Sequence, residues 1–158
     1  PEDGALFDTP KHPDLIYDIG AHLGEDSEYY LRKGFRVVAI EADPDLARAC
    51  RHRLQPFVEQ GRLTIVEGAI VEPGALAAGQ RSVRFYKNDA NSVWGTVRPE
   101  WAERNERLGS SSVPINVAVI DLADVMRTHG VPHYMKIDIE DVDCVCVRSL
   151  ARFRARPD

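Results

Sequence analysis

Two acidic residues and two glycines are spaced in this sequence as a nucleotide-like ligand requires. The segment DIGAHLG, residues 18–24, ends an apolar run with Asp18 and continues into a turn with Gly20 and Gly24. A helix that starts after such a turn directs its first backbone N–H groups at a ligand. Glu41 ends the next apolar run, about 20 residues later, where a carboxylate can accept hydrogen bonds from the ribose hydroxyls. The spacing indicates an adenosine ligand, a unit that both NAD and S-adenosyl-L-methionine (SAM) contain.

The turn departs from the dinucleotide fingerprint at its second glycine. Dinucleotide sites keep G-x-G-x-x-G so that the backbone can approach the pyrophosphate closely. Here the spacing is Gly20-x-His22-x-Gly24, with His22 at the position of the second glycine. We interpret His22 either as a structural replacement in the turn or as a hydrogen-bonding contact to the ligand.

Acidic residues flank the turn on both sides. Asp18 precedes it, and Glu25 and Asp26 follow it. Three carboxylates would repel a pyrophosphate, each at a cost on the order of 1 kcal/mol or more in a partly buried site. SAM reverses the sign, because it carries an ammonium, a sulfonium and a single carboxylate. Asp18 can attract the ammonium while N–H groups of the turn take the carboxylate, so the charges favour SAM over NAD.

Alternating strands and helices must hold these residues at one edge of a sheet. Asp43 and Pro44 start a helix as its N-cap and first helical residue. The β-α-β-α-β order predicts an α/β fold with a parallel sheet and helices on both faces. The strands expected in this half are 15–18, 35–41 and 63–67, with helices at 25–33 and from 43 to about 56, after an irregular lead-in over 1–13.

The second half is less regular and adds another strand that ends in an acid, Asp138. Trp94 lies in a polar loop, and we interpret it as a wall of an acceptor pocket or as a packing residue. Cys144 and Cys146 are two residues apart on an expected helix, about 200° around its axis, so they cannot bind one metal from one helical face. The expected elements are strands 82–86, 115–120 and 134–138 and helices 99–108, 122–128 and 142–150.

The whole-chain composition narrows the possible classes of protein. A length of 158 residues suits one domain over residues 1–158, and a net charge of −5 gives no sign of a basic stripe for nucleic acid. No apolar stretch approaches the ~18 residues that span a bilayer. Three cysteines argue against a disulfide framework and for a reducing compartment, so we expect a cytoplasmic protein. Pro1 is not a natural first residue, so we also expect further residues upstream.

Two segments resemble a known enzyme family. DIGAHLGEDSEYYLRKGFRVVAIEADP is similar to the first cofactor motif of class I SAM-dependent methyltransferases, and most closely to their FkbM-type branch, where asparagine is common in place of His22. YMKIDIEDVD, residues 134–143, resembles the branch's K-I-D-I/V-E-G-x-E/D motif, with Asp141 where glycine is usual. The resemblance covers residues 14–158 in outline and implies a Rossmann-like, doubly wound, mostly parallel sheet.

The resemblance also assigns roles to individual residues. It implies that Glu41 holds the ribose diol and that Ala42 lies under the adenine. Asp138 is the candidate general base, with Glu140 and His133 behind it; the alternative is that Asp138 only orders its loop or binds SAM. A divalent cation shared by Asp138 and Glu140 is the less favoured alternative, and because no third ligand is in view we expect no metal. The remaining contacts that it implies are Asp18, Gly20, Ala21, His22 and Gly24 to the methionine and ribose portions, and Glu67, Gly68 and Ala69 to the adenine.

The expected activity is SAM-dependent transfer of a methyl group to a hydroxyl of a sugar or small natural-product acceptor. The alternatives are a non-catalytic SAM- or nucleotide-binding module, such as a scaffold subunit, and a dehydrogenase, which the loop charges disfavour. We expect no nucleic-acid or membrane partner, and the oligomeric state stays open. RSLARFRARPD, at the end of the chain, resembles the family's approach to its next strand. We therefore expect the family's C-terminal strands to lie beyond residue 158, which leaves strand 134–138 at an open edge.

Overall fold

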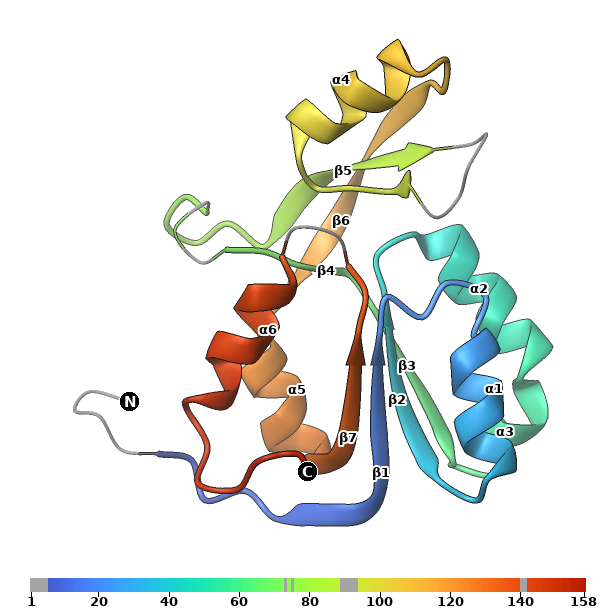
Figure 1. Ribbon diagram of the computed structural model, residues 1–158, viewed down its shortest axis with the longest axis vertical. Coiled ribbons are helices and arrows are strands. Elements are labelled where there is room, and N and C mark those ends of the chain that lie inside the picture. The colour runs from blue at the N-terminus through green and yellow to red at the C-terminus, as the bar shows by residue number, and fades with distance from the viewer. Residues whose placement is uncertain (1–5, 73, 75, 89–93, 140–141) are drawn as a thin grey trace.

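A parallel four-stranded sheet forms the centre of the computed structural model, which describes residues 6–72, 74, 76–88, 94–139 and 142–158. The strands lie in the order β3-β2-β1-β7, and all three pairings are parallel (Figure 1). Their bounds are β1 Lys11–Ile19, β2 Arg36–Glu41, β3 Leu63–Glu67 and β7 Val131–Ile137. Because parallel strands end at the same edge, their carboxyl-terminal residues gather there.

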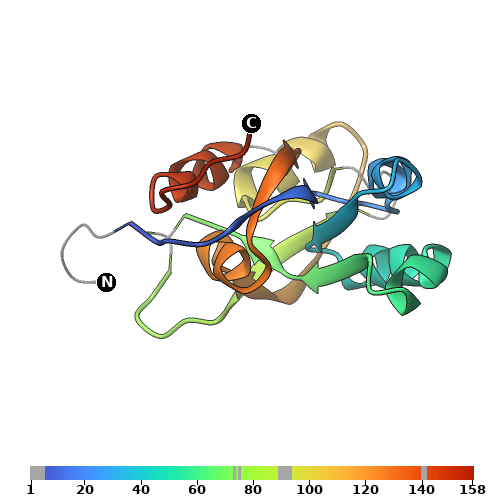
Figure 2. The same cartoon turned by 90° about the horizontal axis from the view of Figure 1, so that it is seen from below.

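Helices cover both faces of this sheet, as the alternating order predicts. The helices α1, α2 and α3 pack beside one face, and α5 and α6 pack on the other (Figure 2). Their bounds are α1 Glu25–Arg32, α2 Pro44–Arg53, α3 Gln55–Glu59, α5 Leu122–His129 and α6 Asp143–Leu150. The mostly parallel α/β fold is thereby confirmed. None of the helices in the described part of the chain is long and apolar enough to cross a bilayer.

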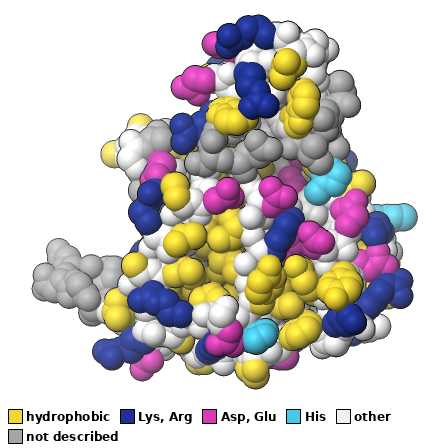
Figure 3. Space-filling view, in the orientation of Figure 1, with side chains coloured by type: hydrophobic (Ala, Val, Ile, Leu, Met, Phe, Trp, Pro, Cys, Tyr) yellow, Lys and Arg dark blue, Asp and Glu magenta, His cyan; other side chains and the backbone are white. Residues whose placement is uncertain are grey.

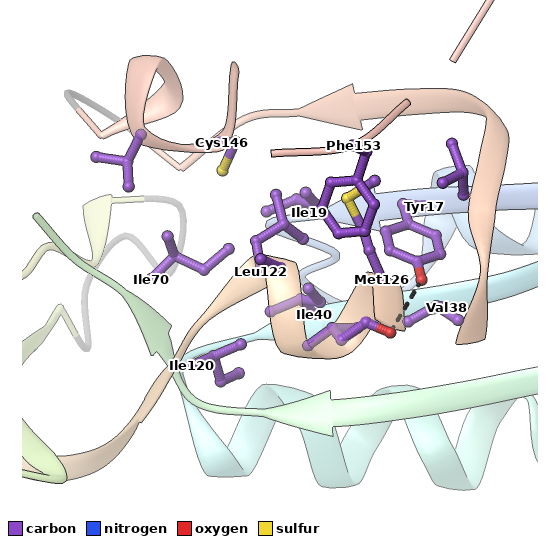
Figure 4. Packing of buried hydrophobic residues seen from close by; sticks show 14 of the residues in the cluster. Tyr17, Ile19, Val38, Ile40, Ile70, Ile120, Leu122, Met126, Cys146 and Phe153 are labelled. Atoms are coloured by element: carbon purple, nitrogen blue, oxygen red, sulfur yellow. Dashed lines mark hydrogen bonds between the residues drawn. The ribbon is translucent and has the colours of Figure 1, made fainter. Parts of the chain in front are cut away.

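The period of two along the strands divides the core between these two faces. Tyr17 and Ile19 of β1 and Ile40 of β2 pack against Leu122 and Met126 of α5 (Figure 4). The Tyr17 hydroxyl lies inside this cluster and donates a hydrogen bond to the carbonyl oxygen of Gly130 at 3.0 Å. Successive side chains of a strand point to opposite faces, so the residues between these apolar ones, Asp18 among them, face α1 instead.

A smaller sheet lies beyond the carboxyl ends of the central strands, at the top of Figure 1. Its order is β4-β6-β5; β4 pairs with β6 in parallel, and β5 pairs with β6 antiparallel. Gly68 joins β3 directly to β4, so the chain passes from one sheet to the other in a single residue. The bounds are β4 Ala69–Ile70, β5 Ser82–Asn88, α4 Pro99–Arg107 and β6 Ser112–Ile120.

Several element boundaries differ from the sequence expectations. β1 starts at Lys11 rather than Leu15, so residues 11–13 of the expected lead-in are strand. Its first residues pair with the start of β7, and the register shifts between His12 and Ile16. Lys11 to Asp14 are polar or partly exposed, which is why no apolar run marks them. The helix that begins at Pro44 ends just before Pro56. α2 stops at Arg53, and a separate short helix, α3, has Pro56 in its first turn.

The strand β7 lies at one end of the strand order, as expected for residues 134–138. Besides its pairing with β1, β7 has a backbone hydrogen bond to the end of the chain: the N–H of Asp158 donates to the carbonyl oxygen of His133 at 2.8 Å. The His133 ring also lies against this chain end, with Nδ1 2.7 Å from a carboxylate oxygen of Asp158. These contacts place His133 at the sheet edge rather than at the carboxyl end of β7.

Candidate cofactor site

A cavity of about 460 Å³ lies at the carboxyl ends of the central strands, under the smaller sheet. Figure 3 shows acidic, basic and histidine side chains gathered at this junction, just below the part of the molecule that holds the smaller sheet and α4. The cavity is lined by the candidate base Asp138 and by seven of the ten residues expected at the cofactor: Gly20, Ala21, His22, Glu41, Ala42, Gly68 and Ala69. Three others, Asp18, Gly24 and Glu67, are not among the lining residues.

The glycine turn is fixed by contacts within the protein. Gly20 has a φ of 82°, and a Cβ atom there would lie 2.0 Å from the backbone oxygen of Asp138. The N–H groups of Gly20 and Ala21 both donate to the carbonyl oxygen of Ile40, at 2.9 and 3.1 Å. Glycine is thus required because the turn after β1 packs against the end of β7, and only a residue without a Cβ atom leaves room for this backbone contact.

His22 also adopts a left-handed conformation, with φ of 54°. Asparagine, aspartate and histidine tolerate this region better than other residues that carry a Cβ. The His22 N–H donates to Glu41 at 2.8 Å, and its Nδ1 lies 3.6 Å from a carboxylate oxygen of Glu25. Histidine and asparagine both tolerate this backbone conformation, and His22 also lines the cavity.

Gly24 has a packing role. It caps α1 with a φ of 81°, and a Cβ there would lie 2.5 Å from the Cys50 sulfur and 2.9 Å from Leu54. The glycine lets α1 approach α2 closely. The structure therefore places Gly24 against the neighbouring helix instead of at the cavity wall.

Glu41 holds the turn and faces the cavity at the same time. One carboxylate oxygen accepts the N–H of His22 at 2.8 Å, and the other accepts the N–H of Asp43 at 2.9 Å. Burial raises the pKa of Glu41, and the two backbone hydrogen bonds act in the opposite direction. A carboxylate has about four acceptor positions, so capacity for two hydroxyl donors remains.

Asp18 lies behind the cavity wall. Its side chain is fully buried, and one oxygen accepts a hydrogen bond from the Ser27 hydroxyl of α1 at 2.6 Å. The other oxygen, Oδ1, has no hydrogen-bond donor among the described residues and lies 3.4 Å from the Lys136 ammonium. Burial raises the pKa of Asp18, against the effects of Ser27 and Lys136. The expected direct contact between Asp18 and a ligand ammonium therefore has no support in this geometry.

Lys136 is a cavity residue to which the sequence analysis assigned no role. Its ammonium lies 3.4 Å from Asp26 and 3.8 Å from Asp138, and it donates to the carbonyl oxygen of Gly20 at 3.2 Å. Burial lowers the pKa of Lys136, but the carboxylates around it outweigh this and raise the pKa overall. Two of the three acids of the loop, Asp18 and Asp26, thus lie beside a cation, which makes the repulsion of a pyrophosphate weaker than three uncompensated carboxylates imply. The sequence signal for Lys136 was its place in the segment YMKID. The register between β1 and β7, which the structure gives, then places Lys136 opposite Asp18.

Asp138 follows β7 and reaches the cavity with a largely exposed side chain. Of its two expected supporting residues, Glu140 lies outside the described residues. His133 stacks on Phe35 with ring centroids 6.2 Å apart and does not line the cavity. Asp138 is therefore the acid that the described structure offers at the strand end. Within the described ranges, no three His, Cys, Asp or Glu side chains gather as a metal site.

Glu67 turns away from the cavity at the end of β3. Its carboxylate pairs with Arg51 of α2 at 2.7 Å, and its side chain is 44% exposed. Gly68 and Ala69, the next two residues, do line the cavity. A Cβ at Gly68 would lie 2.6 Å from the backbone oxygen of Ala118 in β6, so close contact between the two sheets requires this glycine.

The smaller sheet supplies cavity residues that the sequence analysis did not identify. Phe85 of β5 packs over Gly95, where a Cβ would meet its ring at 2.5 Å. No local pattern marks these positions as ligand contacts, since they reach the cavity only when the smaller sheet packs over it. Trp94 instead lies with Trp101 and Asn105 around a separate small cavity, which supports its packing role. The further lining residues from this unit and from the first turn of α2 are Leu46, Ile70, Phe85, Gly95, Thr96 and Val97.

Comparison with known proteins gives two matches. A family model described as the methyltransferase FkbM domain matches residues 18–153. A protein named ribosomal RNA small subunit methyltransferase A, from Anaeromyxobacter dehalogenans (strain 2CP-C), is 37% identical over 79 residues. That alignment covers 49% of this chain and 26% of the relative, so the chain spans about a quarter of the length of this relative.

Proposed function

The chain belongs to the FkbM methyltransferase family, and from this premise we propose that it transfers a methyl group from SAM to a hydroxyl oxygen of a sugar or small natural-product acceptor. The observation that supports SAM is the side-chain chemistry of the cavity lining. It combines a charged cluster around Lys136, the Glu41 carboxylate, and small and apolar residues. SAM has a portion that matches each of these: a charged amino acid, a ribose diol and an adenine.

The residues fit each portion of this ligand. Glu41 keeps acceptor capacity for two hydroxyls beyond its two backbone hydrogen bonds. Ala42, Leu46 and Phe85 offer an apolar surface to a flat ring. An NAD molecule would instead bring its pyrophosphate to the turn, where Asp26 and Asp138 remain on the cavity side.

The proposed chemistry needs little from the protein beyond alignment and a base. SAM supplies a methyl group on a sulfonium, which is already an activated leaving group. Holding donor and acceptor in line can contribute ~7–11 kcal/mol. Asp138 accepts the acceptor's hydroxyl proton in this proposal, because it is an exposed carboxylate at the strand ends where reacting groups lie in open α/β sheets.

The acceptor named in the relative's description, ribosomal RNA, is not part of the proposal. Asp26, Asp138 and Glu25 all border the cavity, and they would repel the phosphates of a nucleic acid. The neutral hydroxyl of a sugar or natural product meets no such repulsion.

Ligand-dependent thermal unfolding tests the choice of cofactor. A ligand at ~100 times its dissociation constant should stabilise the protein by ~2.7 kcal/mol. We expect this stabilisation with SAM and S-adenosylhomocysteine and none with NAD or NADP at the same concentrations. Stabilisation by NAD alone would contradict the proposal.

Transfer of tritium from methyl-labelled SAM to a panel of sugars and hydroxylated small molecules tests the reaction itself. Asp138→Asn should keep SAM affinity and lose transfer by ~10²–10⁴-fold, the range for a general base. Binding of SAM without transfer to any acceptor would favour the non-catalytic module. Full activity of Asp138→Asn would remove the base assignment while leaving the cofactor assignment intact.

A further inference from the structure

Lys136 and Asp26 form a charged pair at the cavity, beside the proposed base Asp138, for which the proposed function has no role yet. A SAM molecule carries a carboxylate and an ammonium on one carbon atom, and both need partners in the protein. From the sequence we expected N–H groups of the glycine turn to take the carboxylate and Asp18 to take the ammonium. In the structure most of those N–H groups have acceptors within the protein, and Asp18 lies behind the cavity wall.

Four of the five N–H groups of the turn, residues 20–24, already have acceptors within the protein. Those of Gly20 and Ala21 donate to Ile40, that of His22 donates to Glu41, and that of Gly24 donates to Ala21 at 2.8 Å. A ligand carboxylate would therefore have to displace a hydrogen bond to reach any of these four. Leaving a buried backbone group unpaired costs ~1–3 kcal/mol, so another donor is favoured.

Lys136 is positively charged, lines the cavity and makes only loose contacts with the acids on that side, so it can serve as this donor. Its ammonium is held from behind by the buried Asp18 oxygen at 3.4 Å and by the Gly20 carbonyl oxygen at 3.2 Å. On the cavity side its neighbours among the described residues are Asp26 and Asp138, at 3.4 and 3.8 Å, and both of these carboxylates are more than half exposed. These two contacts are longer than a good charged hydrogen bond of about 2.7–2.9 Å, so an incoming carboxylate can replace them.

We propose that Lys136 binds the α-carboxylate of SAM and that the Asp26 side chain, released from Lys136, receives its α-ammonium. This inference rests on the proposed function and concerns the amino acid end of the cofactor. The site then recognises the intact zwitterion, because each charge of the ligand replaces one partner in an existing ion pair. The buried Asp18 is a positioning residue that keeps the ammonium of Lys136 at the cavity wall.

Calorimetry with two ligands that differ in one group tests the assignment. Decarboxylated SAM keeps the ammonium, sulfonium and adenosine but lacks the carboxylate. In Lys136→Met, SAM affinity should fall by about tenfold or more, the size of one hydrogen bond to a charged group, while the affinity for decarboxylated SAM changes less than about twofold. The exposed Lys33 lies outside the cavity, so Lys33→Met is the matched control and should change neither affinity.

The single variant leaves Asp18 buried without its cation, which can destabilise the fold. The double variant Lys136→Met/Asp18→Asn removes both charges and should show the same loss of selectivity in a stable protein. Equal losses for SAM and decarboxylated SAM in both variants would overturn the inference and make Lys136 a structural residue. Wild-type protein that binds neither ligand would overturn the proposed function as well, which separates the two failures.

Discussion

At the residue scale, Glu41 shows how one side chain can serve the fold and the ligand together. It orders the turn through His22 and the start of α2 through Asp43, and its carboxylate still lines the cavity. A substitution will therefore change both stability and binding, and the two effects must be measured apart.

Glu41→Ala should weaken SAM binding by roughly 1.5–3 kcal/mol, the contribution of a hydrogen bond to a charged group. Isothermal calorimetry on the folded variant measures this directly. Glu41→Gln is the matched control, since it keeps one acceptor oxygen and the side-chain shape and should lose less. Unchanged affinity in a folded Glu41→Ala variant would rule out the ribose assignment.

Asp18 predicts a pH dependence of stability. Its pKa in the folded protein is raised above the usual 3.8, mainly by burial, so the folded state holds this proton more tightly than the unfolded state. The free energy of unfolding contributed by this group therefore falls as the pH rises from the unfolded pKa through the folded pKa.

Asp18→Asn removes this titration and should lack that fall. The measurement is the difference in unfolding free energy between wild type and variant, from denaturant titrations at several pH values upward from 3.8. We expect the wild type to lose stability relative to the variant as the pH rises. A difference that stays constant with pH would show that burial of Asp18 does not favour its protonated form.

At the element scale, the close approach of the β1 turn to the end of β7 decides the geometry of the charged end of the cavity. Gly20 is the contact point, and its Cβ position falls on the backbone of Asp138. The same contact brings Lys136 and Asp138 beside the turn, so the turn and the end of β7 form one unit.

Gly20→Ala should therefore lower the free energy of unfolding and abolish SAM binding. Gly34 is the matched control, because it has a similar positive φ of 98° but nothing within 4 Å of its Cβ position. Gly34→Ala should cost only the ~1–2 kcal/mol of a left-handed conformation and leave SAM binding intact. Equal effects of the two substitutions on stability and binding would contradict the contact argument.

At the scale of the whole molecule, the cavity lies between two units that are joined at Gly68. The central sheet supplies the charged end and Glu41, and the smaller sheet supplies part of the apolar end. A ligand that fills the cavity must contact both units at once, which couples segments far apart in the sequence.

Hydrogen exchange with and without SAM should show this coupling. We expect slower exchange both in residues 20–22 and in residues 95–97, since a bound ligand stabilises both walls against local opening. Residues 57–60 around α3 lie outside the cavity and serve as the internal control. Protection confined to residues 20–22 would mean that the smaller sheet does not contact the cofactor.

The sequence by itself determined the α/β order, the glycine turn, Glu41 and the acid at the end of β7. These features have local signals: apolar runs of strand length, N-cap residues such as Asp43, and glycines where φ is positive. Asp43 does cap α2 with its side chain. β3 has the predicted bounds and β2 starts one residue later than predicted, whereas β1 extends beyond the prediction at both ends.

Only the tertiary structure decided which of these residues face the cavity. Asp18 is buried under α1, Gly24 packs on Cys50, and Glu67 turns to Arg51, although all three lie next to residues that do line it. Sequence spacing places a residue on an element, but the direction of its side chain depends on its packed neighbours. Lys136 and Phe85 enter the cavity because the β1–β7 pairing and the folding of the smaller sheet bring distant segments together. No pattern within a single short segment carries that information.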